Sequence, residues 1–303
     1  MTSSFVAFVS KRLLASAVFV AVVSGSALTL AHFVPGDATS EAFLSGAGAQ
    51  SIAQERARLG LDRPLYAQLG GWIAGLVRFD LGTSSSFHRP VSDLLWERAA
   101  PTAQLAGTAL LLATLIGLPL GLVTGARPRS FVALLVTPLS IGLVSCPPIV
   151  GALALLLLGV RTGWLSVAPG HLAVPALALA LPLAAMLERL QSQATSEVMA
   201  APDLRAAAAR GLPAWRLLCV HASRQSLRPV LGIYGVVIGS LFSGSLAVEV
   251  VTAWPGLGRL MYDALMGRDL FLVAGCALAG AMFLAAGNLA ADILRAVIDP
   301  RIA

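Results

Sequence analysis

Charge is scarce in this 303-residue chain: Asp, Glu, Lys and Arg make up 12% of it, against about 25% in ordinary soluble domains. Hydrophobic residues make up 57%, which excludes a water-soluble fold and indicates a polytopic membrane protein. Aromatic residues are few, at 6%, and no basic stripe is interleaved with them for base stacking. The net charge of +6 therefore favours basic loops at a membrane over nucleic-acid binding.

Residues that carry catalysis or bind metals are scarce as well. Lys11 is the only lysine, so the phosphate-binding G-x-x-x-x-G-K-[ST] loop is absent and the chain does not hydrolyse ATP by that motif. There is no G-x-S-x-G turn and no H-E-x-x-H helix. We therefore expect no catalytic residue, no metal and no cofactor bound by this chain, and a membrane-embedded enzyme is disfavoured. The cysteines and histidines share no metal-ligand or redox spacing: Cys146, Cys219, Cys276, His32, His88, His171 and His221.

The apolar runs also lack ionisable side chains at their centres. A carrier driven by protons or sodium normally keeps such groups near the middle of the bilayer, where they do the coupling. Here Glu249 is predicted where the fifth helix meets the outer surface, and the other ionisable residues close to the runs are predicted at helix ends, among them His32, Glu188, Asp292 and Arg295. The chain thus offers a membrane pathway without a visible energy source. The energy for transport comes either from an ion gradient, through residues that the sequence does not reveal, or from a soluble partner on the cytoplasmic face.

Six uncharged runs are each long enough to cross a hydrocarbon core of about 30 Å. They predict an all-α membrane protein with six transmembrane helices, in which prolines kink or interrupt the third and fourth runs. The first run has 19 residues, which is longer than the apolar part of a signal peptide and predicts a retained helix. The runs are 13–31, 99–126, 130–160, 162–187, 229–248 and 270–291.

Arginines in the short connections place both termini and the 188–228 loop on the cytoplasmic side. We expect 1–33 to hold the N-terminus and first helix, 99–298 a five-helix core, and 299–303 a cytoplasmic tail. Residues 34–98 are more polar and predict an extracytoplasmic cap. Within the cap, apolar residues from Leu65 to Val77 have helical spacing, which predicts an amphipathic helix on the membrane face or on neighbouring helices.

Small residues recur at four-residue spacing in the second and fifth runs. This pattern lets helix backbones approach closely where hydrophobicity gives no drive for association. Packing within the chain and an interface with another subunit both remain open. The residues are Gly117, Gly121 and Gly125 in the second run, and in the fifth run the pairs Gly235 with Gly239 and Ser240 with Gly244.

The longest polar interruption of the C-terminal two-thirds is residues 199–229, which we call the docking segment. Pro202 and Asp203 suit the start of a short helix from Asp203 to Arg210, and Gly211 suits the left-handed residue that ends it. Pro213 can open a return helix that ends at Pro229. The apolar side of that helix, predicted to lie against the membrane helices, comprises Trp215, Leu217, Leu218 and Val220. A docking surface for a soluble protein and an ordinary amphipathic loop are the two interpretations.

These residues carry a family resemblance. Arg205-Ala206-Ala207 with Gly211, then His221-Ala222 and Leu227-x-Pro229, resemble the cytoplasmic EAA loop of permease subunits in binding-protein-dependent ABC importers. The order of further motifs is similar to the first permease of the dipeptide, oligopeptide and nickel group. These motifs are Pro35-Gly36-Asp37, Leu59-Gly60-Leu61-Asp62-Arg63-Pro64, Asp80-Leu81-Gly82-Thr83-Ser84, Arg89-Pro90-Val91, Trp254-Pro255-Gly256-Leu257-Gly258-Arg259 and Asp299-Pro300-Arg301.

The resemblance implies a type I ABC importer permease in a bacterial or archaeal cytoplasmic membrane. It implies four kinds of contact: a second homologous permease subunit, two ATPase subunits that use ATP and Mg, an extracytoplasmic solute-binding protein, and lipid. The cargo could be a peptide, a nickel chelate, an opine or a glutathione-like compound. A self-contained secondary carrier or channel remains the alternative.

The resemblance also implies a role for the docking segment, as the helix that couples the pathway to the ATPases. That role is carried onto Arg205, Ala206, Ala207 and Gly211, although Arg205 stands where the wider family has Glu. The whole predicted coupling helix comprises Asp203, Leu204, Arg205, Ala206, Ala207, Ala208 and Arg210, with Gly211 as its stop.

Overall fold

The computed structural model describes residues 2–33, 54, 57, 62, 64–78 and 80–298, with side chains except those of 2–9, 243 and 294–298. All regular elements in these ranges are helices, and one isolated antiparallel bridge joins Thr83 and Pro90. The predicted Pro35-Gly36-Asp37 and Asp299-Pro300-Arg301 motifs and the 299–303 tail lie outside the described residues. The all-α prediction is thus confirmed for the part of the chain that the structure describes.

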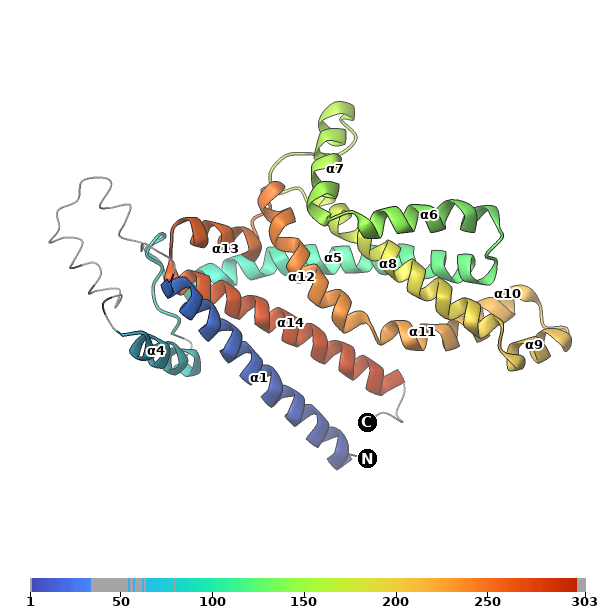
Figure 1. Ribbon diagram of the computed structural model, residues 1–303, viewed down its shortest axis with the longest axis horizontal. Coiled ribbons are helices and arrows are strands. Elements are labelled where there is room, and N and C mark those ends of the chain that lie inside the picture. Colours follow the sequence, from blue (N-terminus) through green and yellow to red (C-terminus); the bar gives the residue numbers. More distant parts are fainter. Residues whose placement is uncertain are drawn as a thin grey trace. The chain divides into compact units, whose positions relative to one another are not determined.

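Five helices are long and apolar enough to cross a membrane (Figure 1). A sixth crossing is made if the bent pair α6 (Phe131–Ser145) and α7 (Pro148–Thr162) counts as one span. The five are α1 (Thr2–Phe33), α5 (Val91–Ala126), α8 (Ala173–Met199), α12 (Tyr234–Val251) and α14 (Leu270–Ile298).

The third predicted run, 130–160, does not form one straight helix. It breaks into α6 and α7, which are bent by 109°. Cys146 takes an extended conformation at the break, because the residue before a proline is sterically pushed out of the helical region. Pro147 then precedes α7, while Pro138 and Pro182 lie inside α6 and α8 without ending either helix. Proline interruption is therefore confirmed for the third run, whereas in the fourth run Pro182 does not end the helix and a kink there stays a prediction.

Several helices extend beyond the apolar runs that predicted them. α8 continues through Met199, twelve residues past the end of its predicted run at Leu187. At its other end α8 is shorter than the run, because it starts at Ala173 and not at 162. α5 starts at Val91, eight residues before the predicted run, and α14 continues to Ile298, so that Asp292 lies inside it. Hydrophobicity marks the lipid-facing part of a helix, whereas the helical backbone continues as long as packing supports it. The first twelve residues of the predicted 188–228 cytoplasmic loop are thus helical, and the side of the membrane on which this loop lies stays a prediction.

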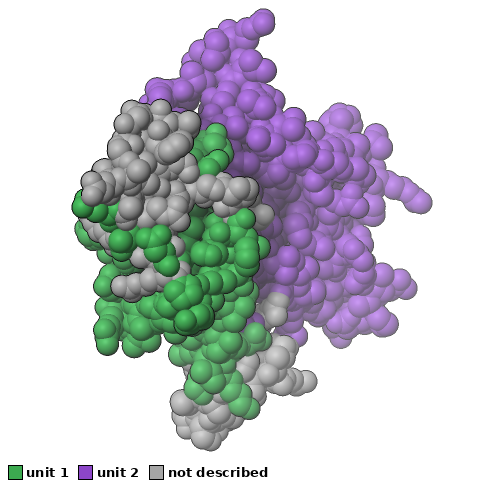
Figure 2. Space-filling view, turned by 60° about the vertical axis from the view of Figure 1, so that its left-hand side comes forward, with its two compact units in different colours: residues 1–103, 255–286 green, residues 104–254, 287–303 purple. Residues whose placement is uncertain are grey.

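The chain forms two compact units, coloured separately in Figure 2. The first comprises 1–103 and 255–286, which include α1, α4 (Leu65–Arg78), α13 (Leu257–Met266) and most of α14. One of its cores joins the start of α5 to α13 and α14 through Val91, Leu260 and Leu272. The other joins α4 to α1 and α14 through Trp72, Leu28 and Ala274.

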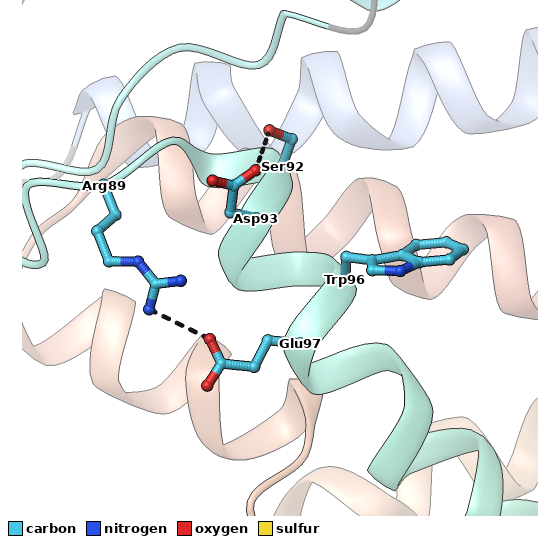
Figure 3. Close-up of a pocket in the computed structure, with 5 residues that line it drawn as sticks. All are labelled: Arg89, Ser92, Asp93, Trp96 and Glu97. Atoms are coloured by element: carbon cyan, nitrogen blue, oxygen red, sulfur yellow. Dashed lines mark hydrogen bonds and ion pairs between the residues drawn. The ribbon is translucent and has the colours of Figure 1, made fainter.

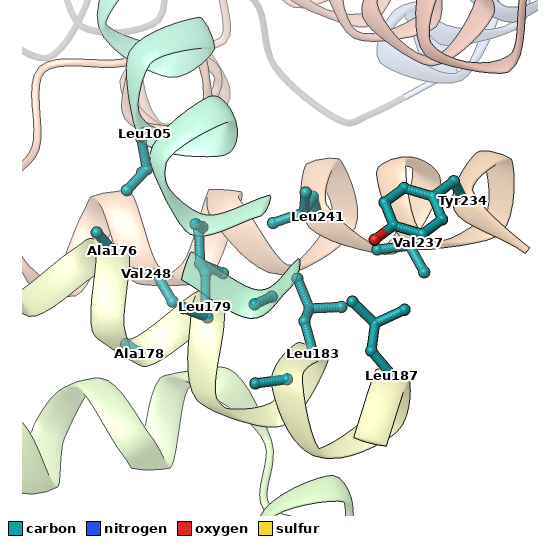
Figure 4. Close-up of a cluster of buried hydrophobic side chains, with 14 of the residues drawn as sticks. Leu105, Ala176, Ala178, Leu179, Leu183, Leu187, Tyr234, Val237, Leu241 and Val248 are labelled. Atoms are coloured by element: carbon teal, nitrogen blue, oxygen red, sulfur yellow. The ribbon is translucent and has the colours of Figure 1, made fainter. Parts of the chain in front are cut away.

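The second unit comprises 104–254 and 287–303 and is built around α8, which contacts α6, α7, α11 and α12. Its core is a cluster of leucine, valine and alanine side chains from α5, α8 and α12 (Figure 4). The C-terminal end of α8 leads into the docking segment. That segment contains α9 (Pro202–Ala209), α10 (Ala214–Arg216), the π-helix η1 (Leu217–Ala222) and most of α11 (Ser223–Leu231).

Candidate functional site

The short helix predicted in the docking segment is present as α9, within one residue of the predicted bounds. Its first residue is Pro202, whose missing N–H leaves no donor unsatisfied at a helix start. Asp203 lies in the first turn, where a negative charge complements the helix dipole. The helix ends before Gly211, which has φ +86°, a left-handed conformation that glycine adopts without strain. α9 is therefore a discrete, two-turn element with sequence-encoded ends.

α9 is held to the rest of the second unit by one narrow face. Leu204 and Ala207, one turn apart, are buried in a small cluster with Leu217 of η1 and Ala222. The other side chains of the helix point outward: Arg205, Ala206, Ala208 and Ala209 are exposed, as are Arg210 and Gly211 that follow. Most of the surface of α9 is therefore small, basic and uncovered by the described residues.

A polar contact completes the attachment of α9. The Gln225 side chain of α11 donates a hydrogen bond to Asp203 Oδ2 at 3.2 Å. This bond, with a smaller contribution from the Leu204 backbone N–H, lowers the pKa of Asp203 below its usual value. Asp203 is fully exposed, so we treat the bond as a positional link between α9 and α11 rather than as a source of stability.

The return helix of the docking segment differs from its prediction in two ways. It runs through α10, η1 and α11 to Leu231, so Pro229 lies inside the helix rather than at its end. Leu217 is buried and Leu218 partly buried, but Trp215 and Val220 are exposed. At about 100° per residue, these four positions spread around the helix and cannot share one face. The predicted apolar side therefore included two residues too many, Trp215 and Val220.

A buried polar cluster lies beside the docking segment, where α5, α8 and α11 meet. It comprises Thr124, Glu188, Gln191, Thr195 and Ser226. Glu188 Oε1 accepts a hydrogen bond from Thr124 Oγ1 at 2.6 Å. Gln191 donates to Ser226 Oγ at 2.7 Å and to Thr195 Oγ1 at 3.1 Å. These bonds connect the long helix α8 to α5 and to the helix that follows α9.

Glu188 corrects a prediction. It was expected at the end of a membrane helix, but it is the 16th of the 27 residues of α8 and only 2% exposed. Its Oε2 atom has no hydrogen-bond partner among the described residues. The predicted run ended at Leu187 because it was defined by the absence of charged residues. A sequence run does not show that Thr124, on another helix, donates a hydrogen bond to Glu188. Pairing across helices is what makes an ionisable residue tolerable there.

The predicted small-residue positions lie against other helices of the same chain. A Cβ added at Gly117, Gly121 or Gly125 would stand 2.2–2.5 Å from a backbone carbonyl oxygen of α8, a distance that real Cβ atoms do not show. We call these three residues the glycine seam. On α12, a Cβ at Gly235 would meet Asn288 and one at Gly244 would meet Leu179 and Pro148, while Gly239 is partly exposed. Close helix contact requires such residues.

The predicted Asp80-Leu81-Gly82-Thr83-Ser84 turn is present in the first unit. Gly82 has φ +76°, and its N–H donates to Asp80 Oδ1 at 3.1 Å. The sequence analysis did not identify the buried Asp269, whose carboxylate accepts hydrogen bonds from this part of the chain. Its Oδ2 accepts hydrogen bonds from Ser84 Oγ and the Ser86 N–H, at 2.5 and 3.1 Å, and Oδ1 accepts one from the Leu272 N–H in the first turn of α14. Asp269 is therefore a structural carboxylate, with donors for both oxygens.

An open depression of about 520 Å³ is lined by residues from the start of α5 and the loop before it (Figure 3). Arg89 and Glu97 form an ion pair across it at 3.2 Å, and Ser92 donates to Asp93. Both partners of the ion pair are about half exposed, so the pair contributes at most about 1 kcal/mol. The depression has no buried polar group aimed into it, and we assign it no role.

Comparison with known proteins fits the motif order. A family model described as binding-protein-dependent transport system inner membrane component matches residues 117–303. The chain is 31% identical over 300 residues to the glutathione transport system permease protein GsiC of Escherichia coli, covering 97% of this chain and 98% of that protein. It is 32% identical over 310 residues to a putative peptide transport system permease protein of Brucella suis, covering 98% of each. The family match includes the glycine seam, the polar cluster and α9.

Proposed function

Because the chain belongs to the family of binding-protein-dependent transport system inner membrane components, as a permease subunit of an ABC transport system, we propose that α9 is the element through which it receives the energy of ATP hydrolysis. The observation that carries this proposal is the exposed surface of α9. Its alanines leave room for another protein's backbone, and positive charge is added by Arg205 in the middle of the helix and by Arg210 at its C-terminal end. The chain itself lacks a phosphate-binding loop, which supports a separate subunit as the source of this energy.

The contacts of α9 suggest how a push on it would travel. Leu204 and Ala207 anchor it on η1, and Asp203 is bonded to Gln225 of α11. Further along α11, Ser226 is bonded to Gln191 of α8. A displacement of α9 would therefore move α11, and through the Ser226–Gln191 hydrogen bond it would act on α8. No covalent step in this chain is needed.

The proposed assembly contains a second, homologous permease subunit, two ATPase subunits and an extracytoplasmic solute-binding protein. ATP and Mg would be used by the ATPase subunits, and this chain would bind no cofactor. Both termini would lie in the cytoplasm of a bacterium or archaeon. This orientation is supported by the excess of arginine in the 127–129 and 188–228 segments over the opposite short connections.

The proposed cargo is a peptide or a small peptide-like compound. Support comes from the relatives, whose names give glutathione in one case and peptides in the other. The names of these relatives give no support to nickel or an opine as cargo.

The test is transport in proteoliposomes that contain the chain with its co-purifying subunits. The quantity measured is uptake of the ligand held by the co-purified binding protein. We expect this uptake to require ATP on the side of the vesicle membrane where α9 lies. An ion gradient across the membrane should not change it. Uptake by the chain alone under a sodium or proton gradient, without any ATPase subunit, would contradict the proposal. That outcome would favour the alternative, a self-contained secondary carrier.

A further inference from the structure

Helix α4 packs on its neighbours through one residue above all, Trp72. Its indole ring is buried between α1 and the start of α14, where Leu28 and Ala274 are fully buried. The indole Nε1 donates a hydrogen bond to Ser24 Oγ at 3.3 Å, and the ring stacks on Phe271 with a centroid distance of 6.4 Å. Leu69 also approaches α1, at Gly25. α4 is therefore firmly seated on the sides of two membrane helices.

The contact on α1 lies at membrane depth. Ser24 comes seven residues before Ala31, the last residue of the uncharged run of α1. At 1.5 Å per residue, Ser24 lies about 10 Å inside the end of that run. Leu28 lies about 4 to 5 Å inside it by the same measure. Thus α4 rests beside the hydrocarbon-spanning part of α1 and not beyond its end.

The outward face of α4 is apolar. Tyr66, Ile73 and Val77 are 79%, 53% and 80% exposed, and their spacing of seven and four residues places them on one side of the helix. No Asp, Glu, Lys, Arg or His occurs from Leu65 to Val77, and Arg78 at the end is exposed. Water is a poor solvent for such a face, since burying apolar surface gains about 25 cal/mol per Å².

We propose that α4 is an interfacial helix whose outward face, Tyr66, Ile73 and Val77, is immersed in the acyl chains of the leaflet at the C-terminal end of α1. At 14 residues, α4 is about 21 Å long, too short to span the bilayer, so it lies along the surface. Arg78 reaches the headgroups with its guanidinium, as long basic side chains at membrane interfaces do.

Lipid is the occupant that the supporting helix indicates. α1 is itself exposed along most of its span, at Leu14, Val18, Val22 and Leu30, all of them apolar. The outward face of α4 and the exposed side chains of the membrane helix that supports it are thus alike in being apolar. This inference does not depend on the ATPase-coupling role proposed for α9, and it concerns the other compact unit.

The experiment places a fluorescent bimane label at Ile73→Cys or Val77→Cys in the assembled transporter. The background carries Cys146→Ser, Cys219→Ser and Cys276→Ala, and lipid nanodiscs are prepared with brominated or ordinary phosphatidylcholine. Asp93→Cys, an exposed position at the start of α5 in the same unit, is the matched control, and Leu14→Cys reports a membrane-facing position.

An interfacial helix buries its apolar face about 5–10 Å below the headgroup boundary, so labels at 73 and 77 should lose roughly half of their emission to bromine on the sixth and seventh acyl carbons. Iodide in the water should quench the label at 93 and barely affect those at 73 and 77. Iodide quenching at 73 and 77 equal to that at 93 would overturn the proposal. Protection from both quenchers would also overturn it, because a protein partner would then cover the face.

A second measurement needs no substitution in α4. A lipid with a photoreactive diazirine on its acyl chain is added to the native transporter, irradiated, and its adducts are located by mass spectrometry. We expect adducts within Leu65–Arg78 at a yield similar to that on the Leu14–Val22 part of α1. Adducts on α1 with none on α4 would overturn the assignment even if the labelled variants failed to fold.

Discussion

Small residues line two helical surfaces of the second unit, and their surroundings differ completely. On α5, the glycine seam lies against α8 so closely that any added Cβ would strike a backbone carbonyl oxygen. On α9, Ala206, Ala208 and Ala209 are exposed, and the described part of the chain places nothing over them. Small residues permit close approach in both places. For α5 the approaching backbone belongs to the same chain, whereas for α9 we propose that it belongs to another protein.

The two surfaces also differ in how they are stabilised. The α5–α8 contact combines tight backbone approach with the polar cluster around Glu188 and Gln191. α9 is held by Leu204, Ala207 and one exposed hydrogen bond. Substitutions in the glycine seam should therefore act on folding, and substitutions on the outer face of α9 should act on coupling. The predictions below separate these two effects, beginning with the largest.

Gly121→Leu should prevent stable folding. A Cβ at this position would stand 2.5 Å from the Glu188 carbonyl oxygen and 2.6 Å from Gln191 Cβ, so α5 would have to move away from α8. Overpacking of this kind costs about 3 kcal/mol or more when backbone is involved. Thermal unfolding of the detergent-purified protein measures the loss. Gly142→Leu on α6 is the matched control, because nothing lies within 4 Å of its Cβ position. Equal stability of the two variants would contradict the close backbone contact between the glycine seam of α5 and α8.

Thr124→Val should destabilise the α5–α8 contact by about 2 kcal/mol, the order of a lost hydrogen bond to a charged group. The substitution keeps the shape of the side chain but removes the donor that Glu188 Oε1 receives at 2.6 Å. Thr162→Val is the control, because it removes an exposed hydroxyl that donates to the Leu158 carbonyl oxygen and accepts from the Trp164 N–H. Chemical or thermal denaturation compares them.

Glu188→Gln sharpens the same point. Glutamine keeps an acceptor for Thr124 and provides an N–H where Oε2 has no partner, so we expect a change of less than about 1 kcal/mol. If Glu188→Gln were as damaging as Thr124→Val, the unpartnered oxygen would have a role that the described contacts do not show.

Ala206→Leu on α9 should leave the unfolding temperature unchanged and reduce ATP-dependent uptake at least tenfold, equivalent to about 1.4 kcal/mol. The added side chain meets nothing in this chain, since Ala206 is exposed, but it would obstruct a docked backbone. Ala100→Leu, at an exposed alanine of α5, is the control. Full transport activity of Ala206→Leu would argue that α9 is an ordinary loop helix.

Gly211→Val should lower the free energy of unfolding by about 1–2 kcal/mol, the cost of a left-handed conformation for a residue with a Cβ. Space is not the cause, because nothing lies within 4 Å of the Cβ position. Gly211→Asn should be tolerated, since asparagine adopts this conformation more readily. Unfolding midpoints of the two variants, with hydrogen exchange of the α9 amides, test whether the effect is local to the helix end.

Much of this comparison was predictable from sequence. Proline, aspartate and glycine encode the ends of α9 locally, so these ends were found to within one residue. Uncharged runs locate the membrane helices, but by themselves they missed the break between α6 and α7 and the start of α8 at Ala173. The position of Glu188 was not predictable in this way, because its tolerance depends on Thr124, 64 residues away in sequence. The same holds for Asp269, which is satisfied by donors from a turn far away in the chain.

The most direct test of the account is photo-crosslinking from α9 in the assembled transporter. A photoreactive amino acid replaces Ala206, and a second sample carries it at exposed Ala100. The account predicts that the Ala206 probe captures an ATP-binding subunit, with a yield that changes when nucleotide is added, and that the Ala100 probe does not. Capture of only lipid or of this chain itself at Ala206, while ATP-driven transport persists, would contradict α9 as the docking element.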